Sequence, residues 1–305
     1  MSETRQELAA AKLNLLLLIR GRRGDGYHEL ATVMVAIDWA DTVRVSLTAE
    51  PGVRLTVSGD WEVPAGPANL AWRAASLFVE RSGCHCGVAI ELTKRIPPGA
   101  GLGGGSSDAG AVLRALRRLA APAVPAAALV EWAAELGSDV PFFAAGCAAA
   151  LCEGRGERVR PLRSGLVGSP VLVVYPGFGC ATRDIYRRWR KSLTSIPPEP
   201  KMIIAALEAG LAETVGRSAY NALAEAVMGK FPILALIREQ LAATGVLGTG
   251  LTGSGSSLFG LYRDRQEAGQ AKEALAQRFG TSLTVCLASC IDPGGVEAAG
   301  WRSPK

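Results

Sequence analysis

The sequence predicts an α+β fold in two domains, each a mostly antiparallel sheet packed against helices. Strand-like apolar alternation dominates the start of the chain, and helical spacing then joins it in both halves. The length of 305 residues suits two domains of about 150 residues each. A hydrophobic share of 49% and a charged share of 20% supply enough apolar side chains for a well-buried core.

The first half begins with strands and continues with helices. Apolar residues at period two predict strands over 12–20, 31–37, 42–47, 54–58 and 88–93. A further apolar run over 147–153 predicts the strand that closes this half. Apolar residues at helical spacing predict helices over 70–81, 126–136 and directly after Ser107. Pro97 and Pro98 end the strand before the last of these, so the local order is strand, glycine loop, helix.

The second half opens after the loop-like segment 161–170, which holds two prolines and two glycines. We therefore divide the chain into domains at 1–162 and 163–305. Apolar runs predict strands over 171–175, 257–262 and 282–287. Helical spacing predicts helices over 182–192, 202–213, 222–227 and 233–244.

A glycine-rich loop at 97–108 is the most informative segment, because it carries five glycines just before a predicted helix. Glycines let backbone N–H groups converge on an anion, and a helix N-terminus adds its dipole. We expect a phosphate site here, with Ser106 or Ser107 capping the helix. The alternative is a glycine-rich turn with a purely structural role.

Two familiar phosphate motifs fit this loop poorly. Gly99 to Gly104 satisfies G-x-G-x-x-G, but no acidic residue follows between Asp108 and Glu131 to hold a ribose. The Gly-Lys-Ser or Gly-Lys-Thr of a Walker A loop occurs nowhere in the chain.

A second glycine-serine stretch, 248–257, runs directly into an apolar strand. A flexible linker would not be enclosed so closely by buried elements. We expect this stretch to pack over the first loop or over the substrate.

Three polar residues stand in apolar surroundings. Lys12 and Asn14 share one face of a strongly apolar strand, which suggests a site, although a lysine there could equally be surface decoration. Asp139 lies in a proline-braced apolar turn, where it could be a general base or merely cap the next helical turn. With only His28 and His85 available, a Ser-His-Asp hydrolase is poorly supported.

Composition and charge narrow the class of protein further. No apolar run near the N-terminus is long enough for a membrane helix, and no signal peptide precedes it, so we expect a cytoplasmic protein without a membrane partner. The net charge of +5 is dispersed and few aromatics accompany it, which disfavours nucleic acid and suits polyphosphates. The seven cysteines predict reduced thiols without disulfides, and Cys84-His85-Cys86 lacks a second ligand pair for zinc.

Taken together, these motifs resemble the kinase superfamily of galactokinase, homoserine kinase, mevalonate kinase and phosphomevalonate kinase. Within it they resemble most the 4-diphosphocytidyl-2-C-methyl-D-erythritol kinase family, over about residues 8–290. The matching segments are 12–14, 21–30, 67–70, 93–107, 137–143 and 251–256.

This resemblance implies a two-domain kinase with its active site in the cleft between the halves. It implies transfer of a phosphoryl group from ATP to the 2-hydroxyl of a cytidine diphosphate-linked methylerythritol, with Asp139 as base beside Lys12. Mg²⁺ would accompany ATP, possibly at Ser106 or Ser107, without a fixed protein metal site. It implies an ATP site with these members: Asn69, Lys94, Pro97, Gly99, Gly101, Leu102, Gly103, Gly104, Gly105, Ser106 and Ser107.

The resemblance also implies the substrate contacts. They are Asn14 at the methylerythritol part, Tyr27, His28 and Tyr186 at the cytidine, and Thr182 and Asp139. Two acidic side chains that are frequent in the family are replaced by Ala222 and Ala224, and Ser138 stands where alanine is usual. The sequence does not decide between a monomer and a weak homodimer.

Two alternative functions stay open from the sequence. One is a sister kinase of the mevalonate or homoserine type. The segment 26–30 argues against this alternative, because such kinases are not expected to share that segment. A catalytically idle nucleotide-binding protein is the other, and the presence of both Lys12 and Asp139 speaks against that.

Overall fold

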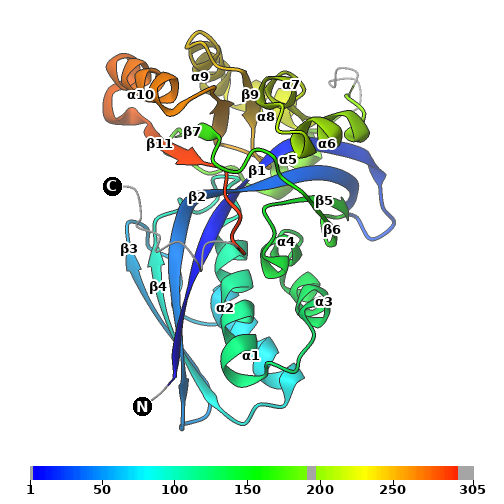
Figure 1. Ribbon diagram of the computed structural model, residues 1–305, viewed down its shortest axis with the longest axis vertical. Coiled ribbons are helices and arrows are strands. Elements are labelled where there is room, and N and C mark those ends of the chain that lie inside the picture. Colours follow the sequence, from blue (N-terminus) through cyan, green and yellow to red (C-terminus); the bar gives the residue numbers. More distant parts are fainter. Residues whose placement is uncertain (1–2, 191–196, 295–305) are drawn as a thin grey trace.

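The computed structural model describes residues 3–190 and 197–294, in which two sheets and their helices form two stacked layers (Figure 1). The first sheet has seven strands, in the order β3-β4-β2-β1-β8, with β5 on the other half of β2 and β6 outside β5. The second has four strands, in the order β11-β7-β10-β9. The α+β class predicted from the sequence is confirmed.

The strands of the first sheet are β1 (Thr4–Arg22), β2 (His28–Thr48), β3 (Val53–Gly59), β4 (Gly87–Lys94), β5 (Ala149–Gly154), β6 (Arg158–Leu162) and β8 (Tyr220–Asn221). Those of the second are β7 (Pro170–Tyr175), β9 (Gly248–Leu251), β10 (Leu258–Leu261) and β11 (Thr284–Ser289). All described pairings are antiparallel except β3 with β4 and β1 with β8.

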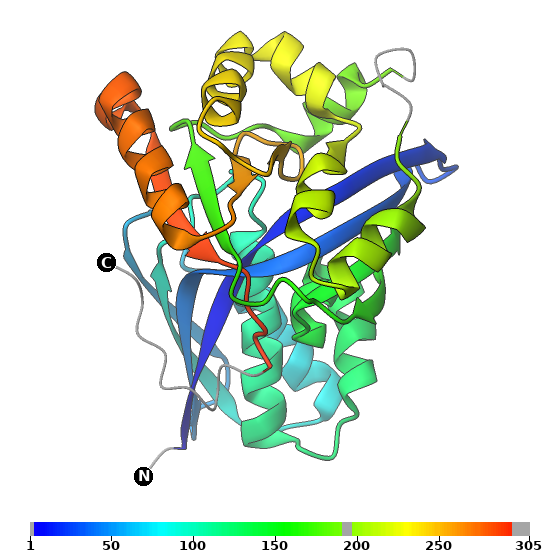
Figure 2. The same ribbon diagram turned by 45° about the horizontal axis from the view of Figure 1, so that its top comes forward.

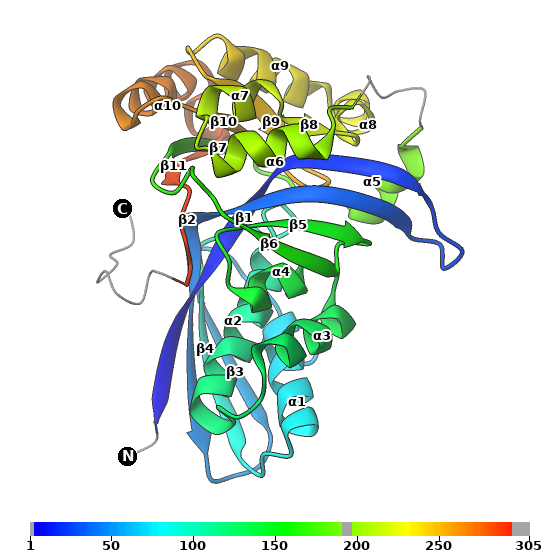
Figure 3. The same ribbon diagram turned by 45° about the vertical axis from the view of Figure 1, so that its right-hand side comes forward.

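Two long strands, β1 and β2, form the frame of the molecule. They pair along nearly their whole length, and register shifts next to Ala10, Asn14 and Ile19 bend the pair. Strand β2 pairs with β4 through its C-terminal half and with β5 through its N-terminal half. The strands predicted over 31–37 and 42–47 are therefore one strand, because the pair continues through Ala40 without a turn. Figure 3 shows this pair curving between the upper and lower parts of the molecule.

Four helices cover one face of the first sheet: α1 (Leu70–Ser82), α2 (Gly104–Ala120), α3 (Ala126–Leu136) and α4 (Val140–Ala145) (Figure 1). Asn69 caps α1 by accepting the N–H of Ala71 at 2.9 Å. Helix α2 buries Val112 and Leu116 against strand residues such as Val43, which fixes the helix along the sheet.

The described part of the second half has six α-helices: α5 (Thr182–Arg188), α6 (Pro200–Glu208), α7 (Ala212–Arg217), α8 (Ala224–Lys230), α9 (Pro232–Ala242) and α10 (Arg265–Phe279) (Figure 2). Of these, α7, α9 and α10 contact the second sheet directly. One apolar cluster joins both layers, with Leu15 and Val33 from the first sheet, Val173 and Phe259 from the second, and Leu207 from α6. The two halves therefore share buried surface.

Several expected elements differ in extent or were missed. The segment 202–213 forms α6 and α7, because Gly210 takes a φ of 72° between them. Helix α10 was not predicted, although Asp264 caps it by accepting the N–H of Glu267. The helix predicted over 182–192 ends earlier, at Arg188, and only positions 191 and 192 of that prediction lie outside the described residues. No described helix has the length and apolarity to cross a membrane.

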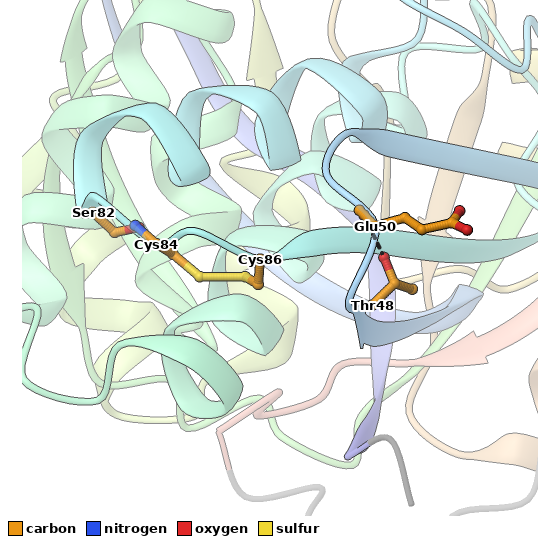
Figure 4. Close-up of a disulfide and its surroundings, with 5 residues drawn as sticks. All are labelled: Thr48, Glu50, Ser82, Cys84 and Cys86. Carbon is orange, nitrogen blue, oxygen red and sulfur yellow. Dashed lines mark hydrogen bonds between the residues drawn. A yellow bond between two sulfur atoms is a disulfide. The ribbon is translucent and has the colours of Figure 1, made fainter.

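The cysteine pattern differs from the expectation of no disulfide. Figure 4 shows Cys84 joined to Cys86 in the turn between α1 and β4, with Cα atoms 5.5 Å apart. Helix α1 ends at Gly83, which takes a left-handed φ of 67° and turns the chain back on itself. The two cysteines lie directly after this turn, and the C-x-C spacing alone did not indicate their pairing. The remaining five cysteines are free.

Candidate active site

A cavity of about 1280 Å³ opens between the two layers. It is lined by both glycine loops, by the polar face of β1 and β2, by the turn before α4 and by α5. Fourteen of the residues predicted for the site line it: Lys12, Asn14, Tyr27, His28, Pro97, Gly99, Gly101, Gly103, Gly104, Gly105, Ser106, Asp139, Thr182 and Tyr186. The fold therefore brings together residues that are up to 174 positions apart in the chain, from Lys12 to Tyr186.

The phosphate loop, residues 97–106, has the backbone that an anion cradle needs. Gly99, Gly101 and Gly103 take φ values of 70°, 81° and 75°, which residues with a side chain rarely adopt. Helix α2 begins at Gly104 with Gly103 as its N-cap, so the N-terminus of a long helix lies at the cavity. The expectation that Ser106 or Ser107 caps the helix is wrong, because both lie inside its first turn.

The second loop, residues 252–257, packs directly on the first. A Cβ on Gly101 would lie 2.2 Å from the carbonyl oxygen of Thr252, so the two backbones are in contact there. The Ser257 N–H also donates to the carbonyl of Ala100 at 3.0 Å. The expectation that this stretch packs over the phosphate loop is confirmed, and it is not a linker.

Lys12 is buried, with 2% of its surface exposed, yet its ammonium is fully engaged. Its Nζ donates to the Gly101 carbonyl at 2.8 Å and to Asn14 Oδ1 at 2.5 Å, and lies 3.8 Å from Asp139 Oδ2. Burial lowers the pKa of the ammonium, and the Asp139 carboxylate opposes that shift. Lys12 is thus an internal cation that faces one carboxylate across the cavity floor, not surface decoration.

Asp139 is the more accessible member of this pair, with 34% of its side chain exposed. It stands at the N-terminus of α4, but its side chain makes no capping hydrogen bond in the described part of the chain. The carboxylate is therefore available to a ligand in the cavity. The capping interpretation of Asp139 is wrong in this structure.

Asn14 ties the second loop to β1. Its Oδ1 accepts the backbone N–H of Gly253 at 2.7 Å, and its Nδ2 donates to Thr32 Oγ1 at 2.7 Å. Asn221 holds the same loop from the other side, donating to the carbonyls of Leu251 and Gly253 at 2.8 Å each. Neither Thr32 nor Asn221 was predicted to have a role, because only the contact with Asn14 or with the loop shows one.

An aromatic group forms the opposite end of the cavity. His28 stacks on Tyr186 with ring centroids 5.0 Å apart and meets Trp189 edge-on at 5.8 Å. The guanidinium of Arg155 lies 5.5 Å from the centre of the Tyr27 ring. Burial and the nearby Arg22 lower the pKa of His28, which favours a neutral imidazole at pH 7. Trp189 and Arg155 were not predicted for the site, because their contacts with His28 and Tyr27 depend on how distant segments fold together.

Four residues predicted for the ATP site lie outside the cavity lining. Asn69 is engaged in capping α1, and Leu102 is buried. Ser107 donates its hydroxyl to the Ala10 carbonyl at 2.7 Å. Lys94 places its ammonium between the carboxylates of Asp41 and Asp108, behind the phosphate loop.

Two family profiles match this chain. The profile of the GHMP kinases N terminal domain matches residues 69–147, and the GHMP kinases C terminal profile matches residues 203–281. A 4-diphosphocytidyl-2-C-methyl-D-erythritol kinase of Citrifermentans bemidjiense is 38% identical over 275 residues, which cover 90% of this chain and 95% of the relative. The chain belongs to the GHMP kinase family.

Other GHMP kinases extend this result. A relative of the same name from Geobacter sp. is 39% identical over 263 residues, covering 86% of this chain and 91% of the relative. A crystal structure of 4-(cytidine 5'-diphospho)-2C-methyl-D-erythritol kinase is 39% identical, covers 93% of this chain and 99% of its own, and has a TM-score of 0.75. The homoserine kinase of Cytophaga hutchinsonii, 20% identical with a TM-score of 0.75 over 96% of both chains, shares the fold. Membership makes the chain a small-molecule kinase that uses ATP.

Proposed function

We propose that this GHMP kinase transfers the γ-phosphoryl group of ATP to the 2-hydroxyl of 4-diphosphocytidyl-2-C-methyl-D-erythritol, giving the 2-phosphate and ADP. The relatives at 38% and 39% identity carry the name of that enzyme. The single observation that carries the proposal is the pair Lys12–Asp139, 3.8 Å apart, between a phosphate loop and an aromatic end. A sister kinase would need the same pair but not the aromatic end.

Asp139 is the proposed base. Its exposed carboxylate accepts the proton of the substrate hydroxyl while the oxygen bonds to the γ-phosphorus and the bond to ADP breaks. Lys12 faces that carboxylate at 3.8 Å and offsets negative charge that develops on the transferred group. Phosphoryl transfer needs little more than alignment and charge compensation, which these two side chains and the loop supply.

The ATP phosphates are proposed to lie on the backbone of residues 101–106. Of the two serines considered for Mg²⁺, Ser106 lines the cavity whereas the Ser107 hydroxyl is bonded to Ala10. Ser106 therefore fits the ion better than Ser107 does. When bound, Mg²⁺ neutralises phosphate charge during transfer.

The aromatic end is proposed to bind the cytidine, with His28 hydrogen-bonding the base edge. His28 and Tyr186 are 5.0 Å apart, too close for a base between them, so the base would stack on an outer face or part the rings. Tyr27 is half exposed beside them and offers such a face. Thr182, whose hydroxyl lies 2.9 Å from that of Ser254, and Asn14 complete the proposed substrate contacts.

We further propose that the kinase works in the cytoplasm, where ATP is at hand, as a monomer or weak homodimer. The proposed domains, 1–162 and 163–305, meet in the loop between β6 and β7, since β6 ends at Leu162. Size-exclusion chromatography with light scattering would measure the oligomeric state.

The test of the proposed reaction is ADP release from Mg-ATP by the purified chain. The cytidylyl substrate, mevalonate and homoserine are compared in parallel assays. Turnover with the cytidylyl substrate alone supports the proposal. Turnover with either of the others would assign the chain to a sister activity, and ATP binding without turnover would favour an idle nucleotide-binding protein.

A further inference from the structure

A buried charge cluster lies behind the phosphate loop, outside the cavity lining. Lys94 ends β4, Asp41 belongs to β2 and Asp108 belongs to α2, and their exposed fractions are 2%, 0% and 2%. The Lys94 ammonium donates to Oδ2 of both carboxyl groups, at 2.8 Å in the case of Asp108. One ammonium thus joins two strands of the sheet to the helix that follows the loop.

Asp41 also holds the chain where the loop begins. Its Oδ1 accepts the backbone N–H groups of Arg95 at 2.5 Å and Ile96 at 2.8 Å. These are the two residues before Pro97, the first residue of the loop. The loop's entry is therefore bound to a carboxylate that neither contacts the cavity nor belongs to a family motif quoted above.

The loop's exit is held by the same cluster. Asp108 stands in the second turn of α2, and Lys94 connects it to Asp41. At Gly104, where α2 begins, an added Cβ would lie 2.9 Å from Ile96 and 3.4 Å from the Lys94 ammonium. Both ends of the loop thus rest on one packed group, which sets the distance between them.

The two carboxyl groups are not equivalent. Asp41 accepts three N–H donors, one from the Lys94 ammonium and two from the backbone at the entry of the loop. Among residues 3–190 and 197–294, no hydrogen-bond partner reaches Asp108 Oδ1. Burial, followed by the neighbouring Asp41, raises the pKa of Asp108 well above its usual range. Asp41 thus contacts the entry of the loop directly, whereas Asp108 meets the cluster through the Lys94 ammonium.

We propose that Asp41 and Lys94 are positioning residues that hold the phosphate loop in its ATP-binding shape, with Asp108 a secondary partner of Lys94. The proposal rests on the proposed use of the loop for the ATP phosphates. It gives Lys94 a positioning role, whereas the family resemblance implied that Lys94 belongs to the ATP site itself.

The experiment compares Asp41→Asn with Asp108→Asn, two substitutions of the same size in the same cluster. At position 41 the amide has one accepting oxygen instead of two, so its NH₂ group would face an N–H donor where a carboxylate oxygen now accepts. At position 108 the amide oxygen can still accept the N–H of Lys94 that Oδ2 receives. Asp38→Asn is the matched control, since Asp38 is also in β2 and accepts a backbone N–H, that of Ser289 at 2.8 Å, away from the loop.

Three quantities are measured for each variant: the Kd of Mg-ADP by calorimetry, the KM of each substrate and the Tm. We expect Asp41→Asn to raise the Kd of Mg-ADP and the KM of ATP by about tenfold or more, because small displacements of a binding loop are costly. The KM of the alcohol substrate should stay unchanged. Asp108→Asn and Asp38→Asn should stay within about threefold of the wild type in nucleotide binding.

Three results would overturn the proposal. Equal losses in Asp41→Asn and Asp108→Asn would mean that the contacts of Asp41 with the loop entry have no special role. A lowered Tm with unchanged Kd in Asp41→Asn would mean a purely structural cluster, and an equal rise in both KM values would mean a general defect of the site. If Asp41→Asn fails to fold, Asp41→Glu, which keeps the charge but displaces the carboxylate, takes its place, and unchanged nucleotide binding in that variant would overturn the proposal. Because Mg-ADP binding needs no turnover, the result stands apart from the identity of the alcohol substrate.

Discussion

At the residue scale, the buried ammonium of Lys12 and the accessible carboxylate of Asp139 divide the proposed work of catalysis. Lys12 is held by the Gly101 carbonyl and Asn14, so it cannot swing away when Asp139 takes up a proton. The difference in burial explains the division. A buried cation supplies fixed charge, whereas an accessible carboxylate can reach the hydroxyl of a bound substrate.

Replacing Asp139 by Asn tests its proposed role as base. We expect kcat to fall by about 10² or more, because the amide cannot accept the hydroxyl proton, while nucleotide affinity persists. Steady-state kinetics with Mg-ADP calorimetry separates the two effects. Turnover close to the wild-type value would remove Asp139 from the mechanism.

From the burial of the Lys12 ammonium we expect kcat to depend on pH. Its pKa is lowered by burial, so the ammonium deprotonates below the ordinary lysine value of about 10.4. The protonated form is the active one, and kcat should therefore decline as pH rises through that lowered pKa. In Lys12→Arg the guanidinium stays charged, so the alkaline decline should vanish although kcat itself is lower. If kcat of Lys12→Arg still declines at alkaline pH with the same midpoint as the wild type, a group other than Lys12 causes the decline.

Replacing His28 by Ala tests the proposed cytidine end. We expect the KM of the cytidylyl substrate to rise about tenfold or more, because a base-edge hydrogen bond and the ring stack with Tyr186 are lost. The KM of ATP should not change, since His28 lies at the end of the cavity away from the phosphate loop. Weaker ATP binding with an unchanged substrate KM would show that His28 acts at the ATP end of the cavity and not at the cytidine.

At the element scale, the contact between the two glycine loops shapes the phosphate site. Gly101 has a φ of 81° and lies against the carbonyl of Thr252, so it tolerates no side chain. Gly101→Ala should lower the free energy of unfolding by about 2 kcal/mol or more, from backbone strain together with overpacking. The matched control is Gly105→Ala, where the nearest atom would lie 3.9 Å away, within a helix. Urea denaturation measures both, and equal stabilities would show that the loops separate easily.

At the scale of the whole molecule, the shared apolar cluster makes the two halves depend on one another. Leu15 and Val33 of the first sheet pack with Val173 and Phe259 of the second, and the cavity is lined from both. We therefore expect one cooperative thermal transition in calorimetry. Mg-ADP at about a hundred times its Kd should stabilise the whole chain by about 2.7 kcal/mol. Two transitions, with only one moved by the nucleotide, would show that the halves unfold independently.

Much of the fold and of the site followed from local pattern. The apolar alternation of β1 and the helical stripe of α2 each depend on neighbouring residues, and so does the glycine loop, whose φ values its composition requires. Fourteen of the predicted site residues line one cavity, because the family motifs identified the local segments that meet there. Local patterns did not predict the disulfide or the position of Gly103 as the N-cap of α2.

By itself, then, the sequence determined the α+β class, the phosphate loop and the identity of Lys12 and Asp139 as the pair to examine. Tertiary structure alone decided that Lys12 is buried, that Asp139 caps nothing, that Asn221 holds the second loop and that Lys94 lies behind the first. The physical reason is that burial, charge balance and loop contact depend on segments far apart in the chain. A local pattern specifies which side chain is present, and packing specifies what that side chain faces.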